Sequence, residues 1–262
     1  MPNASTIALR LKHLVRHGSY VPRGYYVFDD LELVYIPVYK VATTSIKTVL
    51  IRREQQSDAA GEYPQYMEIH HEGPFGRHSL THTQRRYFKF AFVRDPFDRL
   101  VSCYEDRVRK SVDSPTARYY FDTDYNQILI RRLFGDSFRA DMSFADFVTL
   151  VARIPDVLAD EQFKSQYTSL HRFGRLIPDF VGRFESLTDD WRTIADRFGL
   201  RALEHQNPSD REVGATYFGT PEIVDIAAKR YWKDIHSFGY QGAYRELREA
   251  VRGQVAAKSL VA

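Results

Sequence analysis

The hydrophobic pattern of the chain is irregular over residues 1–30, which are polar and rich in turn formers, and becomes regular at residue 33. The run Leu33–Val38 is β-branched and aromatic, which predicts a strand. Directly after it, Ile46, Val49 and Leu50 recur at helical spacing, behind hydroxyl residues that can cap a first turn. The pattern therefore predicts a strand, a short loop and a helix in that order.

A second strand and helix follow after a long irregular segment. Residues 55–83 carry Gly, Pro and His without a sustained period and predict a long loop, which in a compact domain is usually functional. Tyr87–Val93 predicts the next strand. Asp95 is a suitable N-cap and Pro96 suits the first helical position, so this strand also enters a helix through a tight, charged turn.

The remainder of the chain is predicted to be largely helical. Apolar residues recur at three- and four-residue spacing in the segments 125–134, 144–151, 187–198 and 223–238. One more strand is predicted at Pro178–Phe184. Because there is no internal repeat, low-complexity tract or obvious linker, we expect a single α/β domain over residues 1–262, with a helical C-terminal half.

Composition indicates whether the chain can form a core and in which compartment it is expected. The chain has 262 residues, of which 44% are hydrophobic, enough to bury a sizeable core. Its single cysteine, Cys103, can form no intramolecular disulfide, which favours a reducing compartment. The segment Ile7–Val15 is interrupted by charges, and no apolar run approaches the roughly 20 residues of a membrane span. We therefore expect a soluble, non-secreted protein without a membrane span.

The charged residues favour anion recognition. Only nine of the 37 basic residues are lysine, and the arginine side chain presents a planar fork of donors that matches phosphate or sulfate oxygens. A genome rich in G and C, which simply prefers arginine codons, would produce the same bias. Composition alone leaves both interpretations open.

The first strand–loop–helix has the features of an anion site. A helix N-terminus offers unpaired backbone N–H groups and the positive end of the helix dipole. Lys40 stands at its entrance, and Thr43, Thr44 and Ser45 add hydroxyl donors. The segment lacks the glycines of a nucleotide-triphosphate loop, and its lysine precedes the loop instead of closing it. This argues against an ATPase or GTPase.

These residues also carry a family resemblance. Lys40–Leu50, with the sequence KVATTSIKTVL, resembles the 5′-phosphosulfate-binding loop of sulfotransferases, and Phe92–Tyr104, FVRDPFDRLVSCY, resembles their 3′-phosphate-binding motif. The second motif is most similar to the carbohydrate branch that includes the HNK-1 and chondroitin enzymes, sulfotransferase family 2. Weaker similarity continues through Asp179–Trp191 and Tyr231–Tyr240, so the resemblance covers roughly residues 33–240.

The resemblance implies a fold and an activity. The implied fold is a three-layer α/β sandwich with a central parallel sheet, related to P-loop NTPases, and a core at about residues 33–240. The implied reaction moves a sulfuryl group from 3′-phosphoadenosine 5′-phosphosulfate (PAPS) to a hydroxyl of an acceptor, a carbohydrate or glycoconjugate. No metal and no nucleic-acid partner are expected. Since the chain shows neither anchor nor disulfides, a bacterial cytoplasmic enzyme is the expectation.

The resemblance also assigns the donor site. Lys40 would contact the bridging and 5′-phosphate oxygens, with Thr43, Thr44 and Ser45 around the same phosphate. Arg94 and Ser102 would bind the 3′-phosphate. A helix that rises about 1.5 Å per residue places Ser102 two turns beyond Arg94, a span that one phosphate and a long arginine can bridge.

Further site residues are implied with less support from the motifs. Arg211, in the expected loop Asn207–Gly219, would close over the donor. Arg99 is expected to brace its helix by pairing with a carboxylate such as Asp95 or Glu105. Glu185 and Trp191 would either support the nucleotide pocket or pack the sheet edge.

The acceptor hydroxyl needs a base, and a histidine with a pKa near neutrality or a partly buried carboxylate is suited to this. Suitable side chains lie in the long loop, namely His70, His71, Glu72, His78 and His82. By position between the two motifs we favour His71, then His70. Transfer passes through a loose, in-line transition state by analogy with phosphoryl transfer, so Lys40 would stabilise the leaving phosphate.

One position departs from the family pattern. Many relatives carry Pro directly before the loop lysine, whereas here Pro37 precedes Val38, Tyr39 and Lys40. Two other functions remain open from sequence alone: a nucleotide-dependent kinase on a related core, and a non-catalytic polyanion-binding module. The absent glycine loop and the absence of a clear acidic pair for magnesium argue against the kinase.

Overall fold

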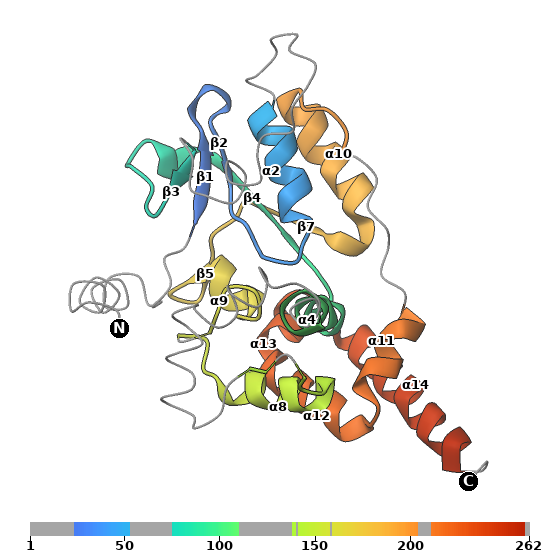
Figure 1. Cartoon of the computed structure of the whole chain (residues 1–262). Coiled ribbons are helices and arrows are strands. Elements are labelled where there is room, and N and C mark those ends of the chain that lie inside the picture. Colours follow the sequence, from blue (N-terminus) through green and yellow to red (C-terminus); the bar gives the residue numbers. More distant parts are fainter. Residues whose placement is uncertain are drawn as a thin grey trace, which may run out of the picture. The chain divides into compact units, whose positions relative to one another are not determined.

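The structure is a computed structural model, shown in Figure 1. It describes residues 24–52, 75–109, 138–139, 141–157, 159–203 and 211–259, apart from the side chains of residues 211–213 and 258–259. The described residues form two compact units. The sheet unit draws on Pro22–Arg94 and Ser169–Pro208, and the helical unit draws on Asp95–Thr168 and Ser209–Ala262.

A five-stranded mixed sheet forms the core of the sheet unit (Figure 1). Its strands, in spatial order, are β3 (Gly76–Arg77), β1 (Tyr25–Phe28), β2 (Leu33–Tyr35), β4 (Phe88–Val93) and β7 (Phe180–Arg183). The pairs β2–β4 and β4–β7 are parallel, with Tyr35 opposite Phe90 and Phe92 opposite Gly182. The pairs of β1 with β2 and β3 are antiparallel. The expected parallel sheet is thus present at its centre, with an antiparallel extension.

Two helices in the sheet unit bury apolar faces. Helix α2 (Thr43–Arg52) buries Ile46, Val49 and Leu50, the three positions whose spacing predicted it. Helix α10 (Leu187–Phe198) has the predicted bounds, and its Trp191 packs against rings of β4. It ends at Gly199, whose φ of 62° lies in the left-handed region that a glycine adopts without a Cβ penalty.

The sheet unit also contains elements that the sequence analysis missed or misjudged. Strand β1 lies inside residues 1–30, where no strand was predicted, although its four residues are all buried. Strand β2 ends at Tyr35, before the predicted end at Val38. Strands β5 (His171–Arg172) and β6 (Arg175–Leu176) form a separate hairpin. A short helix, α9 (Gln166–Leu170), begins in the helical unit and ends directly before this hairpin.

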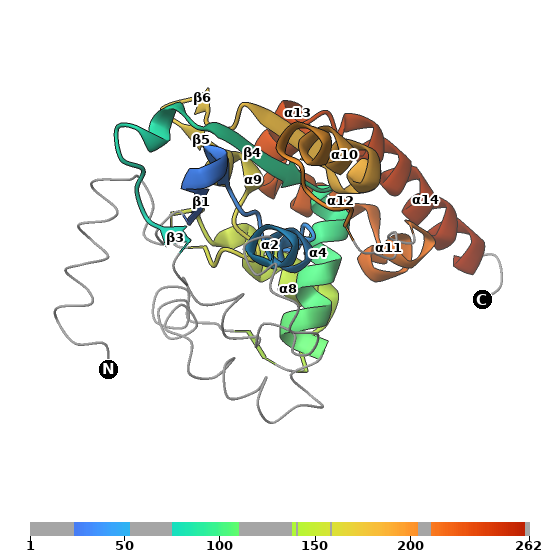
Figure 2. The same cartoon turned by 90° about the horizontal axis from the view of Figure 1, so that it is seen from above.

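The helical unit begins with α4 (Pro96–Tyr104), which continues as a π-helical turn over Glu105–Arg109. The other helices among the described residues of this unit are α8 (Phe144–Arg153), α11 (Arg211–Phe218), α12 (Pro221–Arg230), α13 (Trp232–Ser237) and α14 (Gln241–Ser259). Helices α11, α12 and α14 lie together in the orange and red part of Figure 2. Aromatic rings fill the interior, with Phe144 contacting Tyr104, Phe147 and Phe218.

Two predicted features of this unit need correction. The single helix predicted over residues 223–238 is broken at Tyr231, whose buried hydroxyl donates to the carbonyl of Phe163 at 2.7 Å. The loop expected at Asn207–Gly219 is helical over residues 211–218, which form α11. Its buried Ala215 and Phe218 are three residues apart, the spacing of one helix face. The helix predicted at residues 125–134 lies outside the described residues.

No helix among the described residues is long and apolar enough to cross a membrane.

Candidate donor-binding site

The loop between β2 and α2 is built with two residues in the left-handed region. Lys40 has a φ of 66° and Ala42 a φ of 48°. For residues with a Cβ this conformation costs of order 1–3 kcal/mol each and persists only where the surroundings hold it; such residues cluster at ligand sites. The hydroxyl of Thr43 donates to the carbonyl of Val38 at 2.6 Å and closes the loop.

Helix α2 begins directly after this loop. The N–H of Ile46 donates to the carbonyl of Ala42 at 3.0 Å, so Thr43, Thr44 and Ser45 occupy the first turn. Backbone N–H groups of a first turn have no acceptor within their own helix, and they carry the positive end of the helix dipole. Thr44 is exposed and Ser45 half-buried. Because the hydroxyl of Thr43 is hydrogen-bonded within the loop, Thr43 would bind an anion through its backbone N–H.

Arg94 connects this loop to the next strand. It directly follows β4, and its Nη1 donates to the carbonyl of Lys40 at 3.2 Å. Its guanidinium carbon lies 4.4 Å from the centre of the Phe184 ring. Since β2 and β4 are parallel neighbours, the segments that follow them emerge at the same edge of the sheet, where α/β proteins bind ligands. The structure thus brings together two residues that lie 54 positions apart.

Two buried side chains lie behind the loop. Lys47, on α2, is only 2% exposed, and its Nζ lies 4.1 Å from the centre of the Tyr26 ring. Tyr35 is fully buried, and this burial raises the pKa of its hydroxyl. Lys47 is not among the site residues predicted from the sequence. Positions 43, 46, 47 and 50 share one helix face, and that spacing is the signal that could have revealed its burial.

Ser102 lies on α4, in the helical unit. The helix begins as predicted: the Asp95 carboxylate accepts a hydrogen bond from the N–H of Phe97 at 2.8 Å, and Pro96 occupies the first helical position. Ser102 is half-buried. The structure therefore confirms the strand–turn–helix that carries Arg94 and Ser102, while their joint contact with a phosphate stays a prediction.

Arg99 braces α4 from within. It is 2% exposed and donates to the carbonyls of Lys164 at 2.9 Å and Glu161 at 3.1 Å. The expectation that it holds its helix in place agrees with these contacts, although these acceptors are backbone carbonyls and the predicted ones were carboxylates.

Comparison with known proteins gives these motifs a family. A family model described as "Sulfotransferase family" matches residues 23–241. The chain belongs to the sulfotransferase family.

Curated relatives within the family are carbohydrate sulfotransferases. Carbohydrate sulfotransferase 10 of Xenopus laevis is 27% identical over 243 residues, 82% of this chain and 67% of the relative. Carbohydrate sulfotransferase 11 of Mus musculus is 28% identical over 206 residues, 72% of this chain and 54% of the relative. Carbohydrate sulfotransferase 12 of Mus musculus is 26% identical over 262 residues, 85% of this chain and 61% of the relative.

The chain thus spans about half to two thirds of the length of these relatives. No solved structure matches it significantly.

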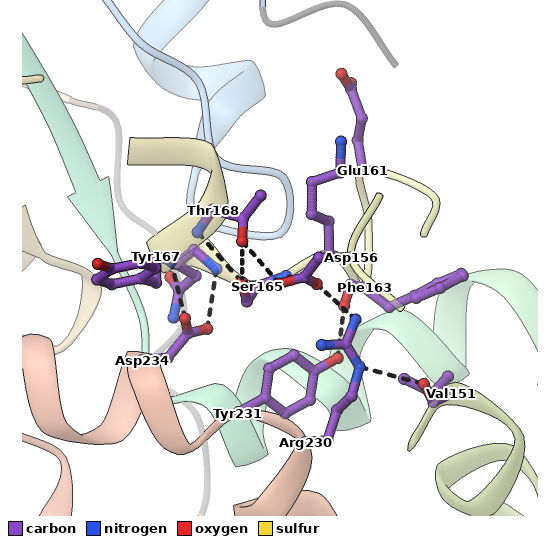
Figure 3. A network of polar contacts seen from close by, with 12 residues as sticks. Val151, Asp156, Glu161, Phe163, Ser165, Tyr167, Thr168, Arg230, Tyr231 and Asp234 are labelled. Atoms are coloured by element: carbon purple, nitrogen blue, oxygen red, sulfur yellow. Dashed lines mark hydrogen bonds and ion pairs between the residues drawn. The ribbon is translucent and has the colours of Figure 1, made fainter. Parts of the chain in front are cut away.

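Trp191 and Asp234, one from each of the two weaker family motifs, make structural contacts. Trp191 is 2% exposed, contacts Phe90 and Phe92, and donates from Nε1 to the carbonyl of Arg201 at 2.9 Å. This supports packing over nucleotide contact for Trp191. In the other motif, the fully buried Asp234 accepts the N–H groups of Gln166 at 2.9 Å and Tyr167 at 2.8 Å (Figure 3).

The buried environment of Asp234 raises the pKa of its carboxyl. Burial raises the pKa of this carboxyl to about 6, although the two N–H donors oppose the shift. We assign Asp234 a structural role, because its carboxylate caps the start of α9.

Several predicted residues cannot be placed in the site. His70, His71 and Glu72 lie outside the described residues. His78 and His82 are described and exposed. Arg211 is the first residue of α11, and its side chain lies outside the described part of the chain. Histidines at the favoured positions therefore stay predictions.

Proposed function

We propose that this chain transfers a sulfuryl group from PAPS to a hydroxyl of a carbohydrate or glycoconjugate. The observation that carries the proposal is the 3.2 Å hydrogen bond from Arg94 to the carbonyl of Lys40. It joins the two segments that resemble the family's 5′-phosphosulfate and 3′-phosphate motifs, at one edge of the parallel strands. Family membership and the carbohydrate sulfotransferase relatives support the reaction and the acceptor class.

The loop suits a phosphosulfate group for chemical reasons. Lys40 supplies a compact positive charge, and the first turn of α2 supplies N–H donors to the same position. In our proposal Thr44 and Ser45 add hydroxyl contacts, while Thr43 contributes its N–H. Arg94 and Ser102 bind the 3′-phosphate, and Arg211 closes over the donor.

The reaction then needs positioning more than covalent chemistry. The bond between sulfur and the bridging oxygen of the 5′-phosphate breaks while a bond between sulfur and the acceptor oxygen forms. Negative charge develops on the leaving phosphate, where the ammonium of Lys40 stabilises it. The proton of the acceptor hydroxyl passes to a base, which we assign to His71, with His70 as the alternative. Adenosine 3′,5′-bisphosphate leaves as the second product.

The finer description of the fold belongs to the same proposal. We assign the sheet unit to the P-loop-NTPase-like, three-layer architecture, because a strand, an anion-binding loop and a helix follow one another at its parallel centre. The left-handed residues Lys40 and Ala42 take the place that glycines hold in a nucleotide-triphosphate loop. A bacterial cytoplasmic location remains part of the proposal.

Calorimetric titration of the full chain tests the donor assignment. Adenosine 3′,5′-bisphosphate should bind without magnesium, and ATP far more weakly. Tight, magnesium-dependent ATP binding would favour the kinase, and binding of neither nucleotide would favour a polyanion-binding module. Transfer of ³⁵S from labelled PAPS to a panel of glycans then tests the reaction, and an absence of transfer to any hydroxylated acceptor would contradict it.

A further inference from the structure

The hairpin of β5 and β6 carries an exposed phenylalanine at its tip. The two strands pair with each other and are not part of the five-stranded sheet (Figure 2). Phe173 and Gly174 form the two-residue loop between the register partners Arg172 and Arg175. Phe173 is 91% exposed, although large aromatic side chains are usually buried. Burial in a core therefore does not explain a phenylalanine at this position.

The backbone of the loop disfavours phenylalanine as well. Phe173 has a φ of 52° and Gly174 a φ of 76°. Two positive φ values in a two-residue hairpin loop are the pattern of a type I′ turn, which favours Asn, Asp or Gly at its first position and Gly at its second. Gly174 fits this preference, whereas a bulky residue such as Phe173 rarely adopts a positive φ. A side chain that is both strained and exposed points to a function outside the fold.

The two arginines beside the loop are a second locally unfavourable feature. Arg172 and Arg175 are exposed and stand directly opposite each other on the paired strands, where like charges are destabilising. No Asp or Glu occurs in the sequence between Glu161 and Asp179. Among the described residues, neither arginine forms an ion pair with a carboxylate. The tip of the hairpin is therefore apolar and positively charged, and an anionic surface would complement it.

The base of the hairpin is fixed to the rest of the sheet unit. Leu170, directly before β5, is fully buried, and its carbonyl accepts the N–H of Ile177, directly after β6, at 2.8 Å. The N–H of Asp179 donates to the carbonyl of Lys89, on β4, at 2.7 Å. Leu176, in β6, is 48% exposed and adds to the apolar surface. A tip on an anchored base is ordered before it meets a partner, which lowers the cost of binding.

We propose that the tip of this hairpin docks onto an anionic lipid bilayer, with Phe173 and Leu176 at the acyl boundary and Arg172 and Arg175 at the lipid phosphates. An apolar side chain flanked by cations suits such a surface, because the ring enters the interface while each arginine is attracted to the headgroups. A bilayer demands no shape complementarity. A specific protein interface uses about 20–30 residues a side, far more than residues 171–176 supply.

This docking does not rest on the proposed function, since none of the hairpin residues is assigned to the donor or to the acceptor. It is a contact with one face of a bilayer and involves no membrane-spanning segment.

Vesicle co-sedimentation of the full chain tests the docking. Vesicles of phosphatidylglycerol and phosphatidylcholine in equal parts are compared with vesicles of phosphatidylcholine alone. We expect a partition constant at least about 10-fold higher on the anionic vesicles. The double substitution Arg172→Ala with Arg175→Ala should remove this preference. Phe173→Ala should lower partition on the anionic vesicles by about 10-fold.

Phe173→Asn separates lipid docking from a role of the ring in the fold. Asparagine suits the first position of a type I′ turn, so this variant should unfold at a higher temperature than the unchanged protein. Its partition on the anionic vesicles should nevertheless fall by about 10-fold, because the apolar ring is lost. A lower unfolding temperature would show that the ring stabilises the fold, and it would overturn the proposal.

Phe173→Trp reports directly on insertion of the tip. This variant should keep the partition of the unchanged protein, because an indole ring also favours the interface between bilayer and water. Its fluorescence, corrected for the two native tryptophans by subtracting the spectrum of the unchanged protein, should shift to shorter wavelength when anionic vesicles are added. Unchanged emission would contradict insertion.

Two matched controls separate the hairpin from general surface properties. Trp232→Ala removes another exposed aromatic side chain, and Arg245→Ala with Arg252→Ala removes the same charge from α14. Both controls should partition within about twofold of the unchanged protein. Equal losses in the two arginine double variants, or equal partition on the two kinds of vesicle, would overturn the proposal. So would binding of an oligothymidylate through Phe173 without vesicle binding, since that would indicate a nucleic-acid surface.

Discussion

The guanidinium of Arg94 donates to the backbone carbonyl of Lys40, and this bond links the ends of two adjacent parallel strands to one loop. Arg94 therefore has two functions in our proposal. It holds the loop in its left-handed conformation, and it presents its remaining donors to the nucleotide. Substitution of Arg94 should accordingly affect ligand binding more than a surface arginine would.

Arg94→Ala should weaken binding of adenosine 3′,5′-bisphosphate by about 10- to 100-fold, since a hydrogen bond to a charged group contributes about 1.5–3 kcal/mol. Calorimetry measures this directly. Arg197→Ala is a matched control, because Arg197 also stacks on a phenylalanine, with its guanidinium carbon 4.0 Å from the centre of the Phe88 ring. Equal affinities for the Arg94 and Arg197 variants would refute the donor-site assignment.

Lys40 combines a charge with an unfavourable backbone conformation, and two substitutions separate these. Lys40→Ala and Lys40→Gly both remove the ammonium, so both should lower turnover at saturating donor by about 100-fold or more. Only glycine also relieves the positive φ, so Lys40→Gly should unfold at a higher temperature than Lys40→Ala. If Lys40→Gly were both more stable and correspondingly more active than Lys40→Ala, the loss of turnover would follow stability and a catalytic role of the ammonium would be contradicted.

His71 is assigned as the base from its position in the sequence. His71→Ala should lower turnover by about 100-fold while affinity for adenosine 3′,5′-bisphosphate is unchanged, because the base contacts the acceptor and not the donor. Exposed His82 provides the comparison, and its alanine variant should keep normal turnover. If only His70→Ala reduces turnover, the base is reassigned to His70.

Gly182 tests the pairing of β4 with β7. A Cβ at this position would lie 2.7 Å from Cδ1 of Phe92, its register partner, so Gly182→Ala should destabilise the protein by about 1–3 kcal/mol. Gly253, inside α14, has no atom within 4 Å of an added Cβ, and Gly253→Ala should stabilise by about 0.5–1 kcal/mol. Urea unfolding measures both, and the same sign for the two would contradict the structure.

The ion pair of Asp156 with Arg230 predicts a pH dependence at acid pH. The pKa of Asp156 is lowered from 3.8 to about 2 in the folded state. Its stabilising contribution is therefore complete above about pH 4 and is lost as the pH falls toward 2. Asp156→Asn should be less stable than the unchanged protein at pH 7, and this difference should shrink between pH 4 and pH 2.

Exposed Asp141 serves as the reference for that measurement, with Asp141→Asn expected to match the unchanged protein at each pH. Urea midpoints at pH 7, 4, 3 and 2 supply the comparison. A difference for Asp156→Asn that stays constant with pH would show that the carboxylate is not held ionised by Arg230.

The elements around the loop between β2 and α2 were predictable from the sequence, because local sequence signals and packing agree there. Val49 and Leu50 mark α2 by spacing, and Asp95 with Pro96 marks the start of α4 by capping chemistry. The pairing of β2 with β4 is not local, and neither is the bond from Arg94 to Lys40. Their proximity in this fold followed only from the family resemblance.

Other features escaped because the decisive contacts are tertiary. Strand β1 is four residues long and gains its order from pairing with β2 and β3, which no window of its own sequence reveals. The break at Tyr231 depends on a hydroxyl that reaches Phe163, 68 residues away. A cavity lined by Arg153, Lys229 and Lys233 unites the end of α8 with α12 and the start of α13, which only the tertiary fold brings together.

The left-handed residues Lys40 and Ala42, in the loop between β2 and α2, have a consequence for evolution and engineering. Glycine at Ala42 would be the simplest stabilising change, since it removes a Cβ from a conformation that disfavours one. The same glycine would also increase the number of conformations that the free loop adopts. Ligand binding would then have to order the loop, and the entropy lost in doing so would weaken the affinity. Selection for thermal stability at this position therefore opposes selection for affinity, and thermostabilised variants should be screened for donor KM before this alanine is changed.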